Sequence, residues 1–378
     1  MALKAAFVGA GNVARVHLTA LRDGEPVSVV GLYDADRARA EERAAEFGVP
    51  RVYGSWAELL GDGEVEVVGV LLPHDLHRQF TVEALEAGKH VVCEKPLAAT
   101  LEECDAMLEA AQRSGRRLFP VQNRLYHLAY EKLGQLAHEG ADGTIFLAQT
   151  NGFEGPQTVG VRPWLGSERK GGGVLMAQAV HPVYALRWLL GDVTRVTCAY
   201  GGRKVVPMVA EDTAVATLTF ASGAVASMTA TFGLAQGPFD HAIMLYGDAG
   251  YLEVRSGRRR GEGAPAETLK AISPTLFGDR ALHEIELPPV TERAADFRRM
   301  WQDYAQAIAG GGEARVSDRD GRQAVEVVLA VGAGDLQRVP VLPRQGDQEA
   351  HQPRQLRQEG LVGEVTQAHR RRRVHDVR

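Results

Sequence analysis

Residues 4–14 read KAAFVGAGNVA and decide the fold of the first part of the chain. An apolar strand runs directly into a G-x-G-x-x-A pattern, and apolar residues at helical spacing follow. In this setting Gly9 permits a tight turn, Gly11 lets the backbone approach a pyrophosphate, and Ala14 keeps the helix close to the sheet. The stretch therefore predicts a dinucleotide-binding α/β fold with a doubly wound parallel sheet.

A carboxylate follows the second predicted strand, Val27–Tyr33. Asp34 lies 23 residues beyond Gly11, where a carboxylate can accept hydrogen bonds from the adenosine ribose. It favours NAD over NADP because it repels a 2′-phosphate, whereas Arg37 nearby can hold one. We therefore predict NAD as the cofactor and leave NADP open.

A second stretch, HVVCEKP at residues 90–96, places an ion pair and a proline at a strand exit. The apolar run is typical of a buried parallel strand, and open α/β sheets bind ligands at the carboxyl ends of such strands. Pro96 biases the backbone of Lys95 towards an extended conformation. For the tripeptide alone, a solvated Glu94–Lys95 pair is the simpler interpretation.

Other predicted strand exits in this part of the chain also carry polar side chains. We therefore expect the ligand-binding residues to lie together at the carboxyl ends of the parallel strands. The residues expected at the cofactor are Gly9, Gly11, Asn12, Val13, Ala14, Asp34, Arg37, Pro73, His74, His77, Glu94, Lys95 and Asn123.

The pattern of elements divides the chain. We expect a Rossmann domain at residues 1–123 and, at 124–330, an α+β domain with a mostly antiparallel open sheet. Residues 331–378 are rich in Gln and Arg with few large apolar side chains, a composition that predicts a disordered extension or the product of a shifted reading frame.

Composition excludes several classes of protein. The 378 residues carry a formal charge of −5, which is not typical of a nucleic-acid or membrane-surface binder. The three cysteines lie far apart without metal-ligand spacing, so we predict neither a disulfide framework nor a metal site. No apolar run has membrane-spanning length. A cytoplasmic setting is expected.

A predicted helix at Val174–Leu190 places His181 and Tyr184 on one face, with Gln178 about one turn before His181. An imidazole and a phenol on one stripe can present an acid or base to a cleft. The alternative is a packed helix whose histidine is satisfied by a neighbour.

Four motifs together resemble the Gfo/Idh/MocA family of oxidoreductases. They are Gly9-x-Gly11-x-x-Ala14, the AGKHVVCEKP string at residues 87–96, Gln122-Asn123-Arg124, and Gly171-Gly172-Gly173 followed by His181. The resemblance implies NAD(P)-dependent oxidation or reduction of a sugar or polyol carbon, and a homodimer or homotetramer formed through the second sheet. It also implies that Lys95 polarises the reacting oxygen and that His181, with Tyr184 as a further candidate, handles the proton.

The chain departs from the family's pattern. Ala177 stands where an Asp is usual four residues before the histidine, Ala179 replaces a usual Gly, and Tyr184 stands where an acid is common. The partner that would orient His181 is therefore missing, and Gln178 or a substrate group is the expected substitute.

The function predicted from the sequence is hydride transfer between nicotinamide and a sugar, polyol or keto-sugar. The alternatives are a cofactor- and sugar-sensing regulator of the same fold, and an enzyme for a linear diol or a tetrapyrrole. The residues expected at the substrate are Lys95, Tyr126, Arg162, Trp164, Gln178 and His181.

Overall fold

The computed structural model describes residues 2–160, 162–201, 208–234, 239–258, 266–289, 294–333 and 337–338. All of them lie within one compact unit, residues 1–340. Most of the predicted tail falls outside the described residues, but its first residues complete a helix that ends at Gly332, and Gln337–Arg338 forms a strand. Ordered structure therefore continues past residue 330. None of the described helices is long and apolar enough to cross a membrane.

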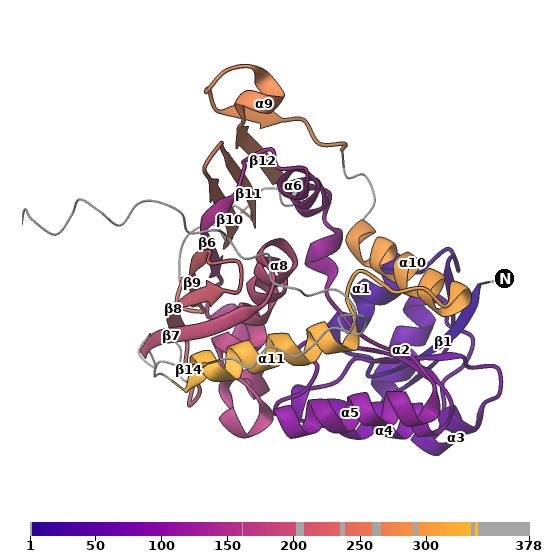
Figure 1. Cartoon of the computed structure of the whole chain (residues 1–378). Coiled ribbons are helices and arrows are strands. Elements are labelled where there is room, and N and C mark those ends of the chain that lie inside the picture. The colour runs from indigo at the N-terminus through magenta and orange to yellow at the C-terminus, as the bar shows by residue number, and fades with distance from the viewer. Residues whose placement is uncertain are drawn as a thin grey trace, which may run out of the picture. The chain divides into compact units, whose positions relative to one another are not determined.

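The first sheet is parallel, with the strand order β2-β1-β3-β4-β5. Its elements are β1 (Leu3–Val8), α1 (Asn12–Ala20), β2 (Val27–Tyr33), α2 (Arg37–Phe47), α3 (Trp56–Gly61), β3 (Val67–Val70), the 3-10 turn η1 (His74–Leu76), α4 (His77–Glu86), β4 (His90–Cys93), α5 (Leu101–Ser114) and β5 (Leu118–Pro120). Figure 1 labels β1 of this sheet and the helices α1 to α5 around it. The chain moves from β1 to β2 on one side and to β3 on the other. The ends of β1 and β3 therefore form the switch point at which such sheets bind ligands.

The second sheet has nine strands in the described part of the chain, in the order β13-β12-β11-β10-β6-β9-β8-β7-β14. Its neighbouring strands are antiparallel except for β6 and β9. The strands are β6 (Ile145–Phe153), β7 (Val193–Gly201), β8 (Thr213–Phe220), β9 (Val225–Thr231), β10 (Phe239–Gly247), β11 (Tyr251–Arg258), β12 (Ala266–Ile272), β13 (His283–Ile285) and β14 (Gln337–Arg338). The predicted fold class is confirmed.

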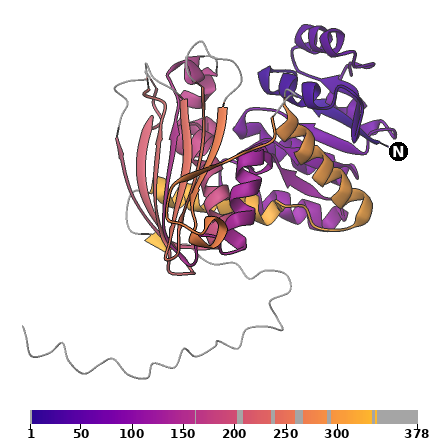
Figure 2. The same cartoon turned by 90° about the horizontal axis from the view of Figure 1, so that it is seen from above.

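Helices of the second part pack on one side of this sheet (Figure 2). Along β8, exposed residues alternate with buried ones, so the other face is open. The helical elements are η2 (Asn123–Tyr126), α6 (Leu128–His138), α7 (Gln157–Gly160), η3 (Pro163–Gly166), η4 (Glu168–Lys170), the π-helical turn η5 (Leu175–Ala179), α8 (Val180–Leu190), α9 (Pro274–Phe277), α10 (Ala295–Gly310) and α11 (Asp318–Gly332).

The last two helices bring the chain back to the first sheet. Trp301 of α10 stacks on Phe7 of β1 with ring centroids 5.9 Å apart. On α11, Arg322 donates to Asp105 of α5 at 2.5 Å and to Glu326 at 2.8 Å. The two sheets are therefore joined by packed helices as well as by the chain between them.

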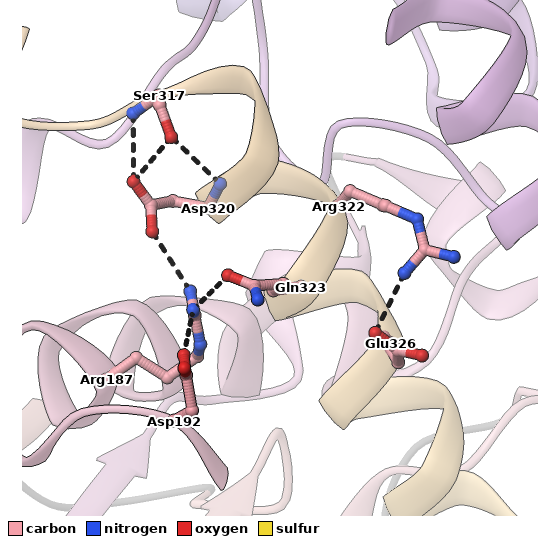
Figure 3. A network of polar contacts seen from close by, with 7 residues as sticks. All are labelled: Arg187, Asp192, Ser317, Asp320, Arg322, Gln323 and Glu326. Atoms are coloured by element: carbon pink, nitrogen blue, oxygen red, sulfur yellow. Dashed lines mark hydrogen bonds and ion pairs between the residues drawn. The ribbon is translucent and has the colours of Figure 1, made fainter. Parts of the chain in front are cut away.

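Arg187 of α8 is the centre of the contact between α8 and α11 (Figure 3). Its side chain is buried and pairs with Asp192 at 2.9 Å and with Asp320 at 3.2 Å. It also donates to Gln323. Asp320 in turn caps α11 through Ser317. A buried guanidinium is tolerated here because two carboxylates compensate its charge.

We predict that Arg187→Met destabilises the protein by roughly 2–4 kcal/mol, because it leaves the carboxylates of Asp192 and Asp320 without their cation. Chemical denaturation measures the change. Arg113→Met is the matched control, since Arg113 is exposed and its ion pairs are 3.5 Å long; a loss below about 0.5 kcal/mol is expected there. Equal losses in the two variants would contradict the role given to Arg187.

Candidate active site

The glycine-rich turn between β1 and α1 has the geometry of a pyrophosphate cradle. Gly9 has φ +96°, and a Cβ on it would lie 2.3 Å from the carbonyl oxygen of Leu71. A Cβ on Gly11 would meet no atom within 4 Å, so open space lies beside it. No side chain caps α1, which begins at Asn12. The first N–H groups of the helix are therefore available to phosphate oxygens.

Asp34 ties the end of β2 to this turn. Its carboxylate accepts the N–H of Ala10 at 2.8 Å and that of Asp36 at 2.9 Å. The nearest guanidinium is that of Arg39, 3.8 Å from Asp34, a residue that the sequence did not single out. Arg37 instead donates to Glu41 of its own helix at 2.8 Å.

Glu94 follows β4 and ends a buried chain of hydrogen bonds. Trp301 donates its indole N–H to Nδ1 of His17 at 3.0 Å, so Nε2 of His17 carries the proton that reaches Glu94 at 3.1 Å. The other carboxylate oxygen of Glu94 accepts the backbone N–H of Lys95 at 3.1 Å. Burial alone would raise the pKa of Glu94, but the hydrogen bond from His17 and the charge of Lys95 outweigh it and lower that pKa.

Lys95 reaches from the first sheet to the second part of the chain, where its Nζ donates to the carbonyl of Ala177 at 2.7 Å. Ala177 lies in the π-helical turn, whose hydrogen-bond register joins a carbonyl to the N–H five residues later. Lys95 is therefore a side-chain donor to a carbonyl of this turn. Burial lowers the pKa of Lys95 to about 8, against the opposing charge of Glu94.

His181 is oriented by a residue that the sequence analysis did not assign to the site. Its Nδ1 lies 2.9 Å from Oε1 of Gln122. Because the amide oxygen is an acceptor, Nδ1 carries the proton and Nε2 keeps its lone pair. Burial, together with the charges of Lys95 and Arg124, holds the pKa of His181 well below its ordinary value. His181 is therefore a neutral imidazole, and Gln122, not Gln178, occupies the orienting place.

Three predicted site residues lie elsewhere. The hydroxyl of Tyr184 is buried without a hydrogen-bond partner among the described residues, beside Gly321 of α11. Tyr126 is buried and donates to Asp303 at 2.6 Å. Asn123 donates to Asp296 of α10 at 2.6 Å. All three side chains contact or face the returning helices or the loop between them.

The residues after β3 hold loops together. His77 contacts the carbonyls of Leu72 at 2.8 Å and Pro96 at 2.9 Å, so it links the exits of β3 and β4. His74, next to Pro73, contacts the carbonyl of Gly171 at 2.7 Å. The Trp164 ring packs on His74 with centroids 4.5 Å apart. These side chains position the loops around Lys95.

Two polar residues near His181, Arg124 and His241, were not assigned to the site from the sequence. Arg124 contacts Gln178 of the π-helical turn at 3.3 Å and His241 of β10 at 3.0 Å. The exit of β5 made Arg124 visible as a candidate, whereas His241 lies within an antiparallel strand and nothing in the local sequence marks it. Among the described residues, no group of three or more His, Cys, Asp or Glu side chains could hold a metal ion.

Two family models match the chain. Residues 3–122 match the oxidoreductase family with an NAD-binding Rossmann fold, and residues 130–253 match the GFO/IDH/MocA C-terminal domain. The chain belongs to the GFO/IDH/MocA oxidoreductase family. Membership confirms the predicted family, the oxidoreductase class and the NAD cofactor, and the open turn at Gly11 with the uncapped α1 fits that cofactor.

Named relatives of the family cover most of the chain. It is 27% identical over 334 residues to the D-apiose dehydrogenase of Paraburkholderia graminis, and the aligned region covers 86% of each protein. It is 25% identical over 256 residues to the myo-inositol 2-dehydrogenase of Thermotoga maritima, covering 66% of this chain and 74% of that enzyme. A levoglucosan dehydrogenase solved with NADH and L-sorbose superimposes with a TM-score of 0.80 at 23% identity, over 90% of this chain and all of that one. At this identity the likeness shows the fold.

We predict that Asp34→Ala weakens NADH binding about tenfold or more and reduces the difference in affinity between NADH and NADPH. The substitution removes a charged acceptor for the ribose and the hydrogen bond to the N–H of Ala10. Fluorescence titration with each nucleotide measures the change. Asp36→Ala is the control, since Asp36 caps α2 and should affect stability rather than cofactor choice. Tighter binding of NADPH than NADH by the wild type would overturn the assignment.

Proposed function

We propose that this protein is an NAD-dependent dehydrogenase or reductase that acts on the CH–OH carbon of a sugar, polyol or keto-sugar. The observation that carries the proposal is the desolvated Lys95, which bridges from the dinucleotide-binding sheet to the carbonyl of Ala177. Neutral His181 follows one helical turn after Ala177. The names of the relatives, which include dehydrogenases of apiose and inositol, support the same substrate class.

In this proposal Lys95 binds the reacting oxygen. NAD, when bound, supplies or accepts the hydride. An ammonium held in a low-dielectric cleft stabilises the negative charge that develops on the substrate oxygen as a carbonyl is reduced, and it does so with little reorganisation. The hydrogen bond of Glu94 to the backbone N–H of Lys95 keeps the lysine at the exit of β4.

The same lysine is the better candidate for the proton. Its pKa of about 8 lies near neutral pH, whereas His181 is held neutral by its lowered pKa. Lys95 therefore gives up its proton in reduction and, as the neutral amine, accepts the hydroxyl proton in oxidation. Because the reacting hydroxyl has a single proton, which goes to Lys95, Nε2 of His181 accepts a hydrogen bond from a neighbouring hydroxyl of the substrate and aligns the reacting carbon. This divides the roles differently from the sequence expectation, which gave the proton to His181 and Tyr184.

A regulator that senses cofactor and sugar, the alternative from the sequence, would gain nothing from a lysine with a lowered pKa. Catalytic turnover distinguishes the dehydrogenase from the regulator. The decisive screen offers sugars, inositols and their keto forms with NAD⁺ or NADH and follows nicotinamide absorbance. Tight NADH binding without turnover of any compound would favour the regulator.

We further propose that the open face of the second sheet forms a homodimer or homotetramer. That face exposes Val215 of β8 and Val225 of β9, which are 48% and 37% accessible. Exposed apolar side chains on a broad sheet are a common feature of interfaces. Light scattering of the purified protein measures the assembly, and a monomer at all concentrations would refute it.

We predict that Lys95→Met lowers kcat about a hundredfold or more while NADH binding stays close to that of the wild type. His181→Asn should cost about tenfold, the value of one lost hydrogen bond. Tyr184→Phe should stay near the wild-type rate, because its hydroxyl has no described partner. Steady-state kinetics on the compound found in the screen decides, and a Tyr184→Phe loss as large as that of Lys95→Met would reverse the assignment.

The pH profile offers a further prediction. Reduction requires the protonated lysine, so kcat/KM should fall about tenfold per pH unit above pH ~8. Glu94→Gln removes a negative charge that raises the pKa of Lys95, so this limb should move to lower pH. NADH titration of the variant controls for folding. A limb that stays in place in Glu94→Gln would show that another group titrates.

A further inference from the structure

Arg124 carries a charge near Lys95 and His181 that the proposed chemistry does not use. It lies in η2, two residues after Gln122, and its side chain is partly buried. Its guanidinium contacts Nδ1 of His241 at 3.0 Å and Oε1 of Gln178 at 3.3 Å. These partners belong to β10 and to the π-helical turn, so Arg124 faces the second part of the chain and not the dinucleotide turn.

Arg124 contacts neutral side chains: His241, Gln178 and the phenol of Tyr130. Burial, with the charge of Arg124 itself, lowers the pKa of His241 to about 2, so the imidazole is uncharged, and Gln178 offers an amide. Among the described residues, no carboxylate forms an ion pair with Arg124. The carboxylate of Glu154 lies 3.7 Å from Nε2 of His241, an atom that the guanidinium contacts at 3.3 Å, but Glu154 forms no ion pair with Arg124.

Arg187 carries a guanidinium with a structural role, and unlike Arg124 it is paired with carboxylates. Arg187, the centre of the network in Figure 3, is held by the carboxylates of Asp192 and Asp320 and by the amide of Gln323. A partly buried cation without such compensation is costly in the free protein. It is expected where a ligand brings the missing charge.

Arg124 belongs to the same cluster of side chains as Lys95 and His181, because its charge acts on both. Gln178, its partner, directly follows Ala177, whose carbonyl accepts from Lys95. Gln122, two residues before Arg124, holds His181. Lys95 and the exposed Arg162 likewise form no ion pair with a described carboxylate. Around a substrate oxygen at Lys95, the second part of the chain therefore places the guanidinium groups of Arg124 and Arg162 as well as the carboxylate of Glu154.

We propose that the substrate carries a carboxylate and that Arg124 binds it, so the enzyme acts on a sugar acid or a related hydroxy acid. This inference rests on the proposed dehydrogenase function. Guanidinium and carboxylate match in planar geometry and form charge-assisted hydrogen bonds. One guanidinium with neutral neighbours suits a single negative charge, which favours a carboxylate over a phosphate ester.

Matched pairs of compounds test the proposal, because each pair differs only in the carboxylate. The pairs are D-glucuronate with D-glucose, D-galacturonate with D-galactose, and D-gluconate with D-glucitol, each assayed with NAD⁺. In at least one pair the acid should have the higher kcat/KM by about tenfold or more. Arg124→Met should remove that preference and leave NADH binding unchanged. Arg113→Met, an exposed arginine far along α5, is the matched control and should keep it.

If none of the six compounds is oxidised, binding measurements test the carboxylate proposal instead. Calorimetry on the NADH-loaded protein should then show an acid binding more tightly than its neutral partner, with the difference lost in Arg124→Met. Neutral sugars used or bound as well as the acids, or a preference that survives in Arg124→Met, overturns the inference and leaves the dehydrogenase function standing. Preference for D-glucose 6-phosphate over D-glucuronate also overturns it. Failure to bind NADH would instead refute the proposed function.

Discussion

The buried hydrogen bond between His17 and Glu94 is the constraint on which the arrangement of the site depends. It joins α1, whose N-terminus is open to phosphate, to the exit of β4, where Lys95 begins. Trp301 of α10 fixes the tautomer of His17 from the other side. A buried carboxylate is stable only while its partners hold it, so the cofactor helix, the lysine and the returning helix α10 keep one relative position.

The second part of the chain completes the site through its backbone. Lys95 donates to the carbonyl of Ala177 in the π-helical turn. The contact draws the lysine out of water, and desolvation brings its pKa towards neutrality. A backbone carbonyl adds no formal charge, so this contact does not neutralise the lysine.

Local patterns predicted the elements of the Rossmann sheet, because the turn at Gly9, the carboxylate of Asp34 and the exit at Lys95 each follow from residues close in sequence. The sequence could not predict which side chains meet across long distances. Trp301 reaches His17 and Asp296 reaches Asn123 from a helix that returns after the second sheet. Tyr184 shares a helix with His181, but the packing of α11 turns its hydroxyl towards Gly321. Periodicity placed these residues on elements without showing what the elements pack against.

Competitive acetylation of the lysines, followed by mass spectrometry of the Lys95 peptide across pH, tests the central claim most directly because it needs no substrate. A lysine that lies desolvated beside the bound nicotinamide should label with an apparent pKa near 8, and NADH should slow its labelling while leaving the other lysines unchanged. An apparent pKa near the ordinary 10.5, with no protection by NADH, would contradict the place and the role given to Lys95.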